Sequence, residues 1–144
     1  MPLTYLSMGY CSFSDLSVLR KSKLTTLLLP NTKVVDLSPL AGLPLKELDL
    51  ASTPVVNLTP LKGLPLNKLH LVGTRVADLT PLAECPGLEE IVLPSGARNL
   101  DALRGLPRLD KMTYGTPGWY GDWAKVPPIA DFWKAYDAQK GKKK

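Results

Sequence analysis

Asp49 and His70 are the residues of this chain whose types and spacing come closest to catalysis. A carboxylate beside an imidazole is part of the catalytic triad of serine hydrolases. The two residues stand 21 positions apart, and the same spacing leads back from Asp49 to Leu28 and then to Ser7. Leu28 thus separates Ser7 from the pair, so no nucleophile lies within reach. We expect a solvent-exposed pair in which Asp49 raises the pKa of His70 slightly, and no catalysis.

The spacing of Asp49 and His70 belongs to a repeat that runs through the chain. The unit LxxLxL opens at six leucines with spacings of 21, 21, 21, 22 and 21 residues: Leu3, Leu24, Leu45, Leu66, Leu88 and Leu109. A pattern of this kind with a period of about 20 to 29 residues is typical of a leucine-rich repeat solenoid. The predicted fold class is α/β, with a parallel sheet on the concave face and short 3₁₀ turns on the convex face.

Two further positions of the repeat predict how its turns are built. Thr32, Thr53 and Thr74 share a position at which an inward hydroxyl group can satisfy backbone groups. Hydroxyl residues precede prolines in Ser38-Pro39, Thr59-Pro60 and Thr80-Pro81. A hydroxyl residue at the N-cap with proline after it starts a helical turn, and we expect the hydroxyl groups to act as the caps.

The repeat can be assigned to a known type. LxxLxLxxT followed by VxDLSPL or VxNLTPL, as in residues 45–61, resembles leucine-rich repeats of the internalin type. The chain looks most similar to C-terminal repeat arrays of planctomycete proteins, which include serine/threonine kinases. The resemblance covers residues 3 to about 137. It implies a solenoid that serves as a recognition surface, but it names no partner, because such arrays differ widely in specificity.

Equivalent strand positions of a solenoid stack into rows on the concave face. In one row the charge alternates from Glu47 through Lys68 and Glu90 to Lys111. We expect a surface ladder worth at most about 1 kcal/mol per pair, rather than a charged ligand site. Tyrosines and an exposed Leu28 at the N-terminal half suggest a binding surface. The candidate protein-binding residues are Tyr5, Ser7, Tyr10, Leu28, Glu47, Asp49, Lys68, His70, Glu90 and Val92.

Charge and cysteine usage exclude several other functions. The net charge is +5, but four of the basic residues are lysines within the last five positions, so the rest of the chain is nearly neutral. Nucleic-acid binding is therefore not expected. No apolar run approaches the ~18 residues that span a membrane. Cys11 and Cys85, both predicted to be interior, lie too far apart for a disulfide, which favours a reducing, cytoplasmic setting. No cofactor loop, metal-ligand cluster or nucleophile–base pair appears.

The sequence predicts a cap over the apolar core at the C-terminal end of the array and none at the N-terminal end. Residues 1–114 are predicted to form the array, 115–139 a capping loop and helix, and 140–144 a disordered basic tail. The loop contains Gly115, Pro117, Gly118 and Gly121, and the helix should run from about Ile129 to Ala138 with one apolar face: Ile129, Phe132, Trp133 and Tyr136. The N-terminal repeat has no such cover. We expect an apolar end surface of Leu3, Leu6, Met8, Phe13, Leu16 and Leu19, and self-association through residues 1–22.

The sequence as a whole favours a non-catalytic protein–protein interaction module that presents a concave repeat surface. It would be a fragment or arm of a longer bacterial protein. The alternatives are a purely structural spacer or cap, and a regulatory arm of a serine/threonine kinase. The partner is a protein that the sequence does not identify, and an enzyme is not expected.

Overall fold

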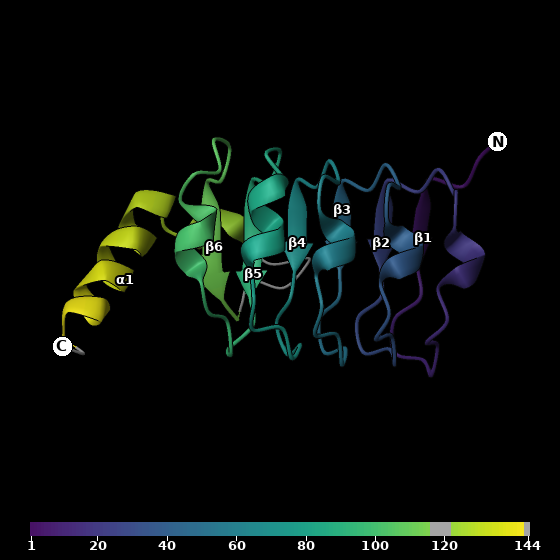
Figure 1. The fold of residues 1–144 in the computed structure, drawn as a ribbon, viewed down its shortest axis with the longest axis horizontal. Coiled ribbons are helices and arrows are strands. Elements are labelled where there is room, and N and C mark those ends of the chain that lie inside the picture. The colour runs from purple at the N-terminus through teal and green to yellow at the C-terminus, as the bar shows by residue number, and fades with distance from the viewer. Residues whose placement is uncertain (116–121, 143–144) are drawn as a thin grey trace.

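The computed structural model describes residues 1–115 and 122–142. Within them, six parallel strands form one sheet in chain order. The strands are β1 (Tyr5–Ser7), β2 (Thr26–Leu28), β3 (Glu47–Asp49), β4 (Lys68–His70), β5 (Glu90–Leu93) and β6 (Lys111–Tyr114). The predicted fold class is confirmed: Figure 1 shows the strands side by side along the long axis, with the N-terminus at one end and a helix at the other.

Short 3₁₀ segments connect the strands and form the convex side, as the repeat predicts. They are η1 (Ser17–Leu19), η2 (Ser38–Leu40), η3 (Thr59–Leu61), η4 (Thr80–Glu84) and η5 (Leu100–Leu103). The core lies between the sheet and these segments, and leucine is its dominant residue. The middle residue of β2, Leu27, and those of β3 and β4, Leu48 and Leu69, are completely buried. Each repeat thus covers the apolar side chains of the one before it.

The register of the sheet confirms the predicted rows. Glu47 pairs with Lys68, and Lys68 pairs with Glu90. In the second row, Asp49 lies between Leu28 and His70. The 22-residue interval between the fourth and fifth units does not disturb the rows, because the extra residue is accommodated outside the strands.

The threonine position works as expected, whereas the turns begin differently from the prediction. The hydroxyl groups of Thr32, Thr53 and Thr74 each donate to the carbonyl three residues earlier, at 2.7–3.0 Å. The predicted hydroxyl caps are wrong. At η2 and η4 the carboxylate two residues earlier accepts the backbone N–H, as Asp36 does from Ser38 and Asp78 from Thr80, both within 2.9 Å. The hydroxyl groups of Ser38 and Thr80 donate to the same carboxylates, so they act as donors.

One backbone position after each of β1 to β4 adopts the left-handed conformation. Its φ is 59° at Tyr10, 56° at Asn31, 56° at Ser52 and 73° at Gly73. In this conformation Tyr10 N donates to Pro30 O, and Asn31 N to Ala51 O, both at 2.8 Å. The left-handed turn therefore links each of the first three repeats to the next. Asparagine and glycine tolerate this conformation far better than a bulky residue such as tyrosine does.

The N-terminal end of the array is less apolar than the sequence suggested. Leu16 and Leu19 are buried, so they do not contribute to the end surface. Leu3 is exposed, and Leu6, Met8 and Phe13 are half-buried. Cys11 is exposed, against the prediction of an interior thiol, although Sγ donates to Met8 O as the threonines do in later repeats. The physical reason is its place in the first repeat, where no earlier described repeat covers it.

The other end is covered by α1 (Ile129–Lys142), which packs against β6 and η5. Phe132, Trp133 and Tyr136 are partly buried against the core, as the apolar face of the helix predicted. The helix continues past Ala138 to Lys142, so the predicted disordered tail is wrong for residues 140–142, while 143–144 lie outside the described residues. The predicted loop residues Pro117, Gly118 and Gly121 also lie outside them.

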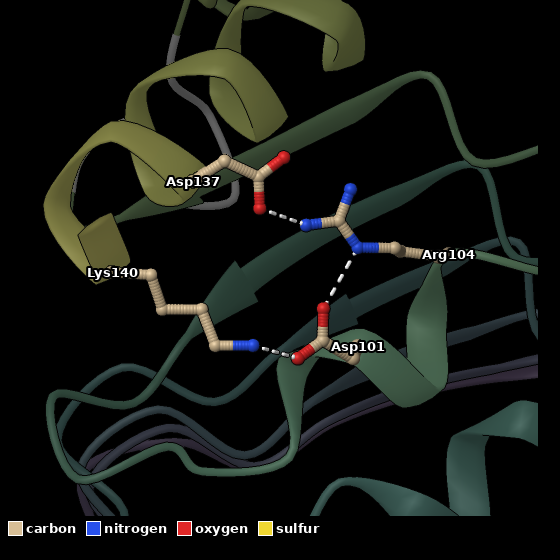
Figure 2. Close-up of polar contacts among 4 residues, drawn as sticks. All are labelled: Asp101, Arg104, Asp137 and Lys140. Carbon is tan, nitrogen blue, oxygen red and sulfur yellow. Dashed lines mark hydrogen bonds and ion pairs between the residues drawn. The ribbon is translucent and has the colours of Figure 1, made fainter. Parts of the chain in front are cut away.

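Four charged residues fasten α1 to the convex side of the fifth repeat. Arg104 lies between Asp101 and Asp137, and Lys140 reaches back to Asp101 at 2.6 Å (Figure 2). The guanidinium carbon of Arg104 also lies 4.3 Å from the ring centroid of Trp133. Hydrogen bonds from Lys140 and Arg104 lower the pKa of Asp101. These pairs are exposed, so each contributes little to stability.

Substitution of Trp133 tests the cap. Trp133→Ala removes a half-buried ring from the end of the core and the surface on which Arg104 lies, so we expect the free energy of unfolding to fall by about 2–3 kcal/mol. Chemical denaturation measures this loss. Lys134→Ala, on the exposed side of the same helix, is the matched control and should stay within about 0.5 kcal/mol of the parent. Equal stabilities for both variants would contradict the cap.

Candidate functional site

Among residues 1–115 and 122–142, one segment covers part of the concave face, and no described segment crosses the rest, over β1 to β3, which we call the open half. The covered half lies over β4 to β6, where a short segment that we call the strap, residues 122–126, crosses the sheet. It contains the 3₁₀ turn η6 (Trp123–Lys125). The ring of Trp123 lies 5.6 Å from that of His70, centroid to centroid. At the other end of the strap, Val126 is buried and its carbonyl accepts a hydrogen bond from Lys111 Nζ at 2.8 Å.

The strap overturns the prediction for His70. His70 has only 1% of its surface exposed, so it does not lie on an open strand face. Burial, with a smaller contribution from the like charge of Lys68, lowers the pKa of His70 to about 4. The predicted rise was wrong because the sequence gave no sign that Trp123 would cover the imidazole and remove it from water. Protonation would place a charge in this covered site.

Asp49 is also buried, with 5% of its surface exposed. Its Oδ1 accepts a hydrogen bond from Ala51 N at 2.8 Å. Burial raises the pKa of Asp49, although the Ala51 hydrogen bond opposes the rise. The prediction of a solvent-exposed Asp49–His70 pair is therefore wrong for both residues, because both are buried. Leu28 lies between Asp49 and Ser7 in the sheet, as expected, so these residues do not form a triad.

The charge ladder forms only in part. Lys68 Nζ lies 3.6 Å from Glu90 Oε2, which is an ion pair along the predicted row. Lys111, the next member, donates to Val126 O of the strap instead. Glu47 is half-exposed at the boundary between the two halves. The row therefore serves partly to hold the strap and only partly as a surface ladder.

The open half lies over β1 to β3 and contains a hollow of about 380 Å³. Tyr10 is the most exposed aromatic residue on its rim, at 80%. Tyr5 and Ser7 are exposed on β1, whereas Leu28 is buried, contrary to its predicted projection, as is Val92 under the covered half. The lining residues are Ser7, Met8, Gly9, Tyr10, Leu28, Pro30 and Asp49.

The structure thus places four of the ten predicted binding residues, Ser7, Tyr10, Leu28 and Asp49, around one hollow. The others lie beside it or toward the strap. Sequence reasoning missed Trp123, Val126 and the second role of Lys111. The only signal was the tryptophan-rich stretch after Gly115, which indicated a cap but not that part of it would turn back over the sheet. It also missed Met8, Gly9 and Pro30, which line the hollow because the chain leaves each strand there.

Across residues 1–115 and 122–142, no group of three or more histidine, cysteine, aspartate or glutamate side chains could hold a metal ion. Cys85 is buried, its Sγ donates to Leu61 O at 3.2 Å, and burial raises the pKa of the thiol. No helix in the described part of the chain has the length and apolar character to cross a bilayer.

The covered state of His70 predicts a pH dependence. We expect His70 to titrate near 4, and Trp123→Ala to move the pKa toward 6.5 by admitting water. The pKa of His70 is lower in the folded state than in the unfolded state, so the unfolded chain takes up the proton first as the pH falls. The free energy of unfolding should therefore be highest above about pH 6.5 and should fall by roughly 3 kcal/mol as the pH decreases toward 4. An NMR titration of this single histidine measures the pKa.

Trp133→Ala, which removes a tryptophan far from the concave face, is the control and should leave the His70 pKa unchanged. A wild-type titration at 6.5 or above would show that Trp123 does not cover the imidazole.

The fold is found in solved structures. Neither a protein-family model nor a curated protein matches the chain. The crystal structure of an internalin (InlF) from Listeria monocytogenes aligns with a TM-score of 0.71 and 27% identity, over 79% of this chain and 35% of the internalin chain. That of internalin C2 from the same organism aligns with a TM-score of 0.70 and 28% identity, over 76% of this chain and 50% of that one. The chain therefore spans half or less of either protein, and its structure is an internalin-like leucine-rich repeat solenoid.

Proposed function

We propose that this chain is a non-catalytic protein-binding module whose partner docks on the open half of the concave face, over β1 to β3. The observation that carries the proposal is Tyr10. This tyrosine is highly exposed on the rim of the hollow and is held in the left-handed conformation at φ 59°. Bulky residues rarely adopt it, and residues kept in such conformations are concentrated at functional sites.

Comparison among the repeats strengthens this point. The equivalent residues are Asn31, Ser52 and Gly73, which are small and suit a left-handed turn. The first repeat could use asparagine or glycine there with less strain, yet it has an aromatic side chain. Tyr5 stands nearby on β1 and is also exposed, at 52%. Two exposed tyrosines beside a hollow are a composition typical of the centre of protein interfaces.

The strap limits where a partner can bind. Trp123 and Val126 lie on the concave face over β4 to β6. A partner that leaves the strap in place can therefore reach only the first three strands. Several finer expectations stay predictions: the planctomycete and kinase connection, the place within a longer bacterial protein, the cytoplasmic setting, and self-association through residues 1–22. The exposed Leu3 and half-buried Leu6, Met8 and Phe13 support the last of these, over a smaller surface than first expected.

Replacing the two tyrosines by the residues of the second repeat tests the proposal. Tyr5→Thr/Tyr10→Asn should abolish capture of partner proteins from bacterial lysate by the immobilised chain. It should also raise the free energy of unfolding by about 0.5–1 kcal/mol, because asparagine is less strained at positive φ. Capture is measured by quantitative mass spectrometry, and stability by chemical denaturation.

The matched control is Val35→Ser/Val56→Ser, which changes two exposed apolar residues outside the strands. It should capture the same proteins as the parent. If the parent captures nothing specific, or if all three forms capture the same set, the binding proposal fails and the structural spacer becomes the better interpretation.

A further inference from the structure

We propose that the hollow between Tyr10 and Asp49 binds an arginine side chain of the partner, with the guanidinium group against the Asp49 carboxylate and beside the Tyr10 ring. This inference rests on the proposed function and specifies its chemistry. It begins from Asp49. Only 5% of the surface of this residue is exposed, yet the residue lines the hollow.

The surroundings of Asp49 leave its charge uncompensated. Its neighbours in the sheet are Leu28, which is aliphatic, and His70, which is neutral above pH 4. In the described part of the chain no lysine or arginine pairs with Asp49, and burial raises its pKa. One hydrogen bond, from Ala51 N, reaches Oδ1. A carboxylate has about four acceptor positions, so this one described hydrogen bond leaves most of its capacity unused. A buried, unpaired carboxylate is unfavourable, and a cation that reaches it regains that free energy.

The charge of the open half points to the same ligand. The outward positions of β1 to β3 are Tyr5, Ser7, Thr26, Leu28, Glu47 and Asp49, which include two acidic residues and no basic one. Lys68, the nearest base in the adjacent row, pairs with Glu90 on the far side from Glu47. This local negative surface belongs to a chain with a net charge of +5, so it does not follow from composition. It favours a positively charged group over a neutral or acidic one.

Tyr10 favours arginine among the cations. A planar guanidinium can lie on an aromatic face while it donates two parallel hydrogen bonds to a carboxylate. The chain itself has a similar contact at its other end, where the guanidinium carbon of Arg104 lies 4.3 Å from the ring centroid of Trp133. The same Arg104 lies between the carboxylates of Asp101 and Asp137 (Figure 2). Gly9 and Pro30, which both line the hollow, lie close together: a Cβ on Gly9 would approach Pro30 Cγ to 2.9 Å, so a larger residue at position 9 would displace this wall of the hollow.

The test uses two small probes, N-acetyl-arginine amide and the isosteric but uncharged N-acetyl-citrulline amide, with the whole chain in ¹⁵N-labelled form. Arginine amide should shift the backbone signals of Ser7, Tyr10, Leu28 and Ala51 and saturate in the millimolar range, whereas citrulline amide should bind at least about tenfold more weakly, the ratio that corresponds to 1.4 kcal/mol. Asp49→Asn, which keeps an oxygen for Ala51 N, should abolish the difference between the probes.

The control variant is Asp36→Asn, which removes an exposed carboxylate from a convex turn and should keep the full preference for arginine. Unchanged signals outside the hollow confirm that each variant is folded. The proposal is overturned if the two probes bind equally, if neither binds, or if Asp49→Asn keeps the preference. Each of these results leaves the capture experiment with the tyrosine variant free to succeed, so the two proposals can fail separately.

Discussion

Every feature of this molecule depends on the requirement that each repeat bury the apolar side of the repeat before it. A single unit of about 21 residues has one strand and one turn, too little to enclose a core. Its leucines become buried only when an identical unit lies in register beside it. The left-handed turns and the Asp or Asn side chains that accept from the 3₁₀ segments serve this register, since they return the chain to the same place after each repeat.

This requirement also explains how much the sequence could predict. Interior positions such as Leu48 and Thr53 recur with the repeat, and their strand, register and hydrogen bonds follow from the period alone. Exposure does not recur in the same way. Cys11 and Thr53 hold equivalent positions, but Cys11 is exposed because it belongs to the first repeat. The repeat pattern predicts the contacts of a residue within its own unit. Its exposure also depends on whether a neighbouring unit covers it, which differs at the ends of the array.

The concave face shows the same limit at the candidate site. The order of Leu28, Asp49 and His70 in the sheet was predicted correctly, but the exposure of Asp49 and His70 was not. The His70 ring is contacted by the ring of Trp123, which lies more than 50 positions further along the sequence. No periodic signal could place that ring, because the strap belongs to the non-repeating end of the chain. The error in the His70 pKa followed directly from this, as did the assumption that the whole sheet is available to a partner.

The left-handed position after each of β1 to β4 has a further consequence. Tyr10, Asn31, Ser52 and Gly73 form a column of exposed positions, one in each of the first four repeats. The backbone N–H of Tyr10, Asn31 and Ser52 donates to the next repeat in the same way. All four positions share the same backbone conformation and are exposed, so the side chain at each does not have to fit the packing of the core. The side chain at this position can therefore change from one repeat to the next while the backbone of the array stays the same.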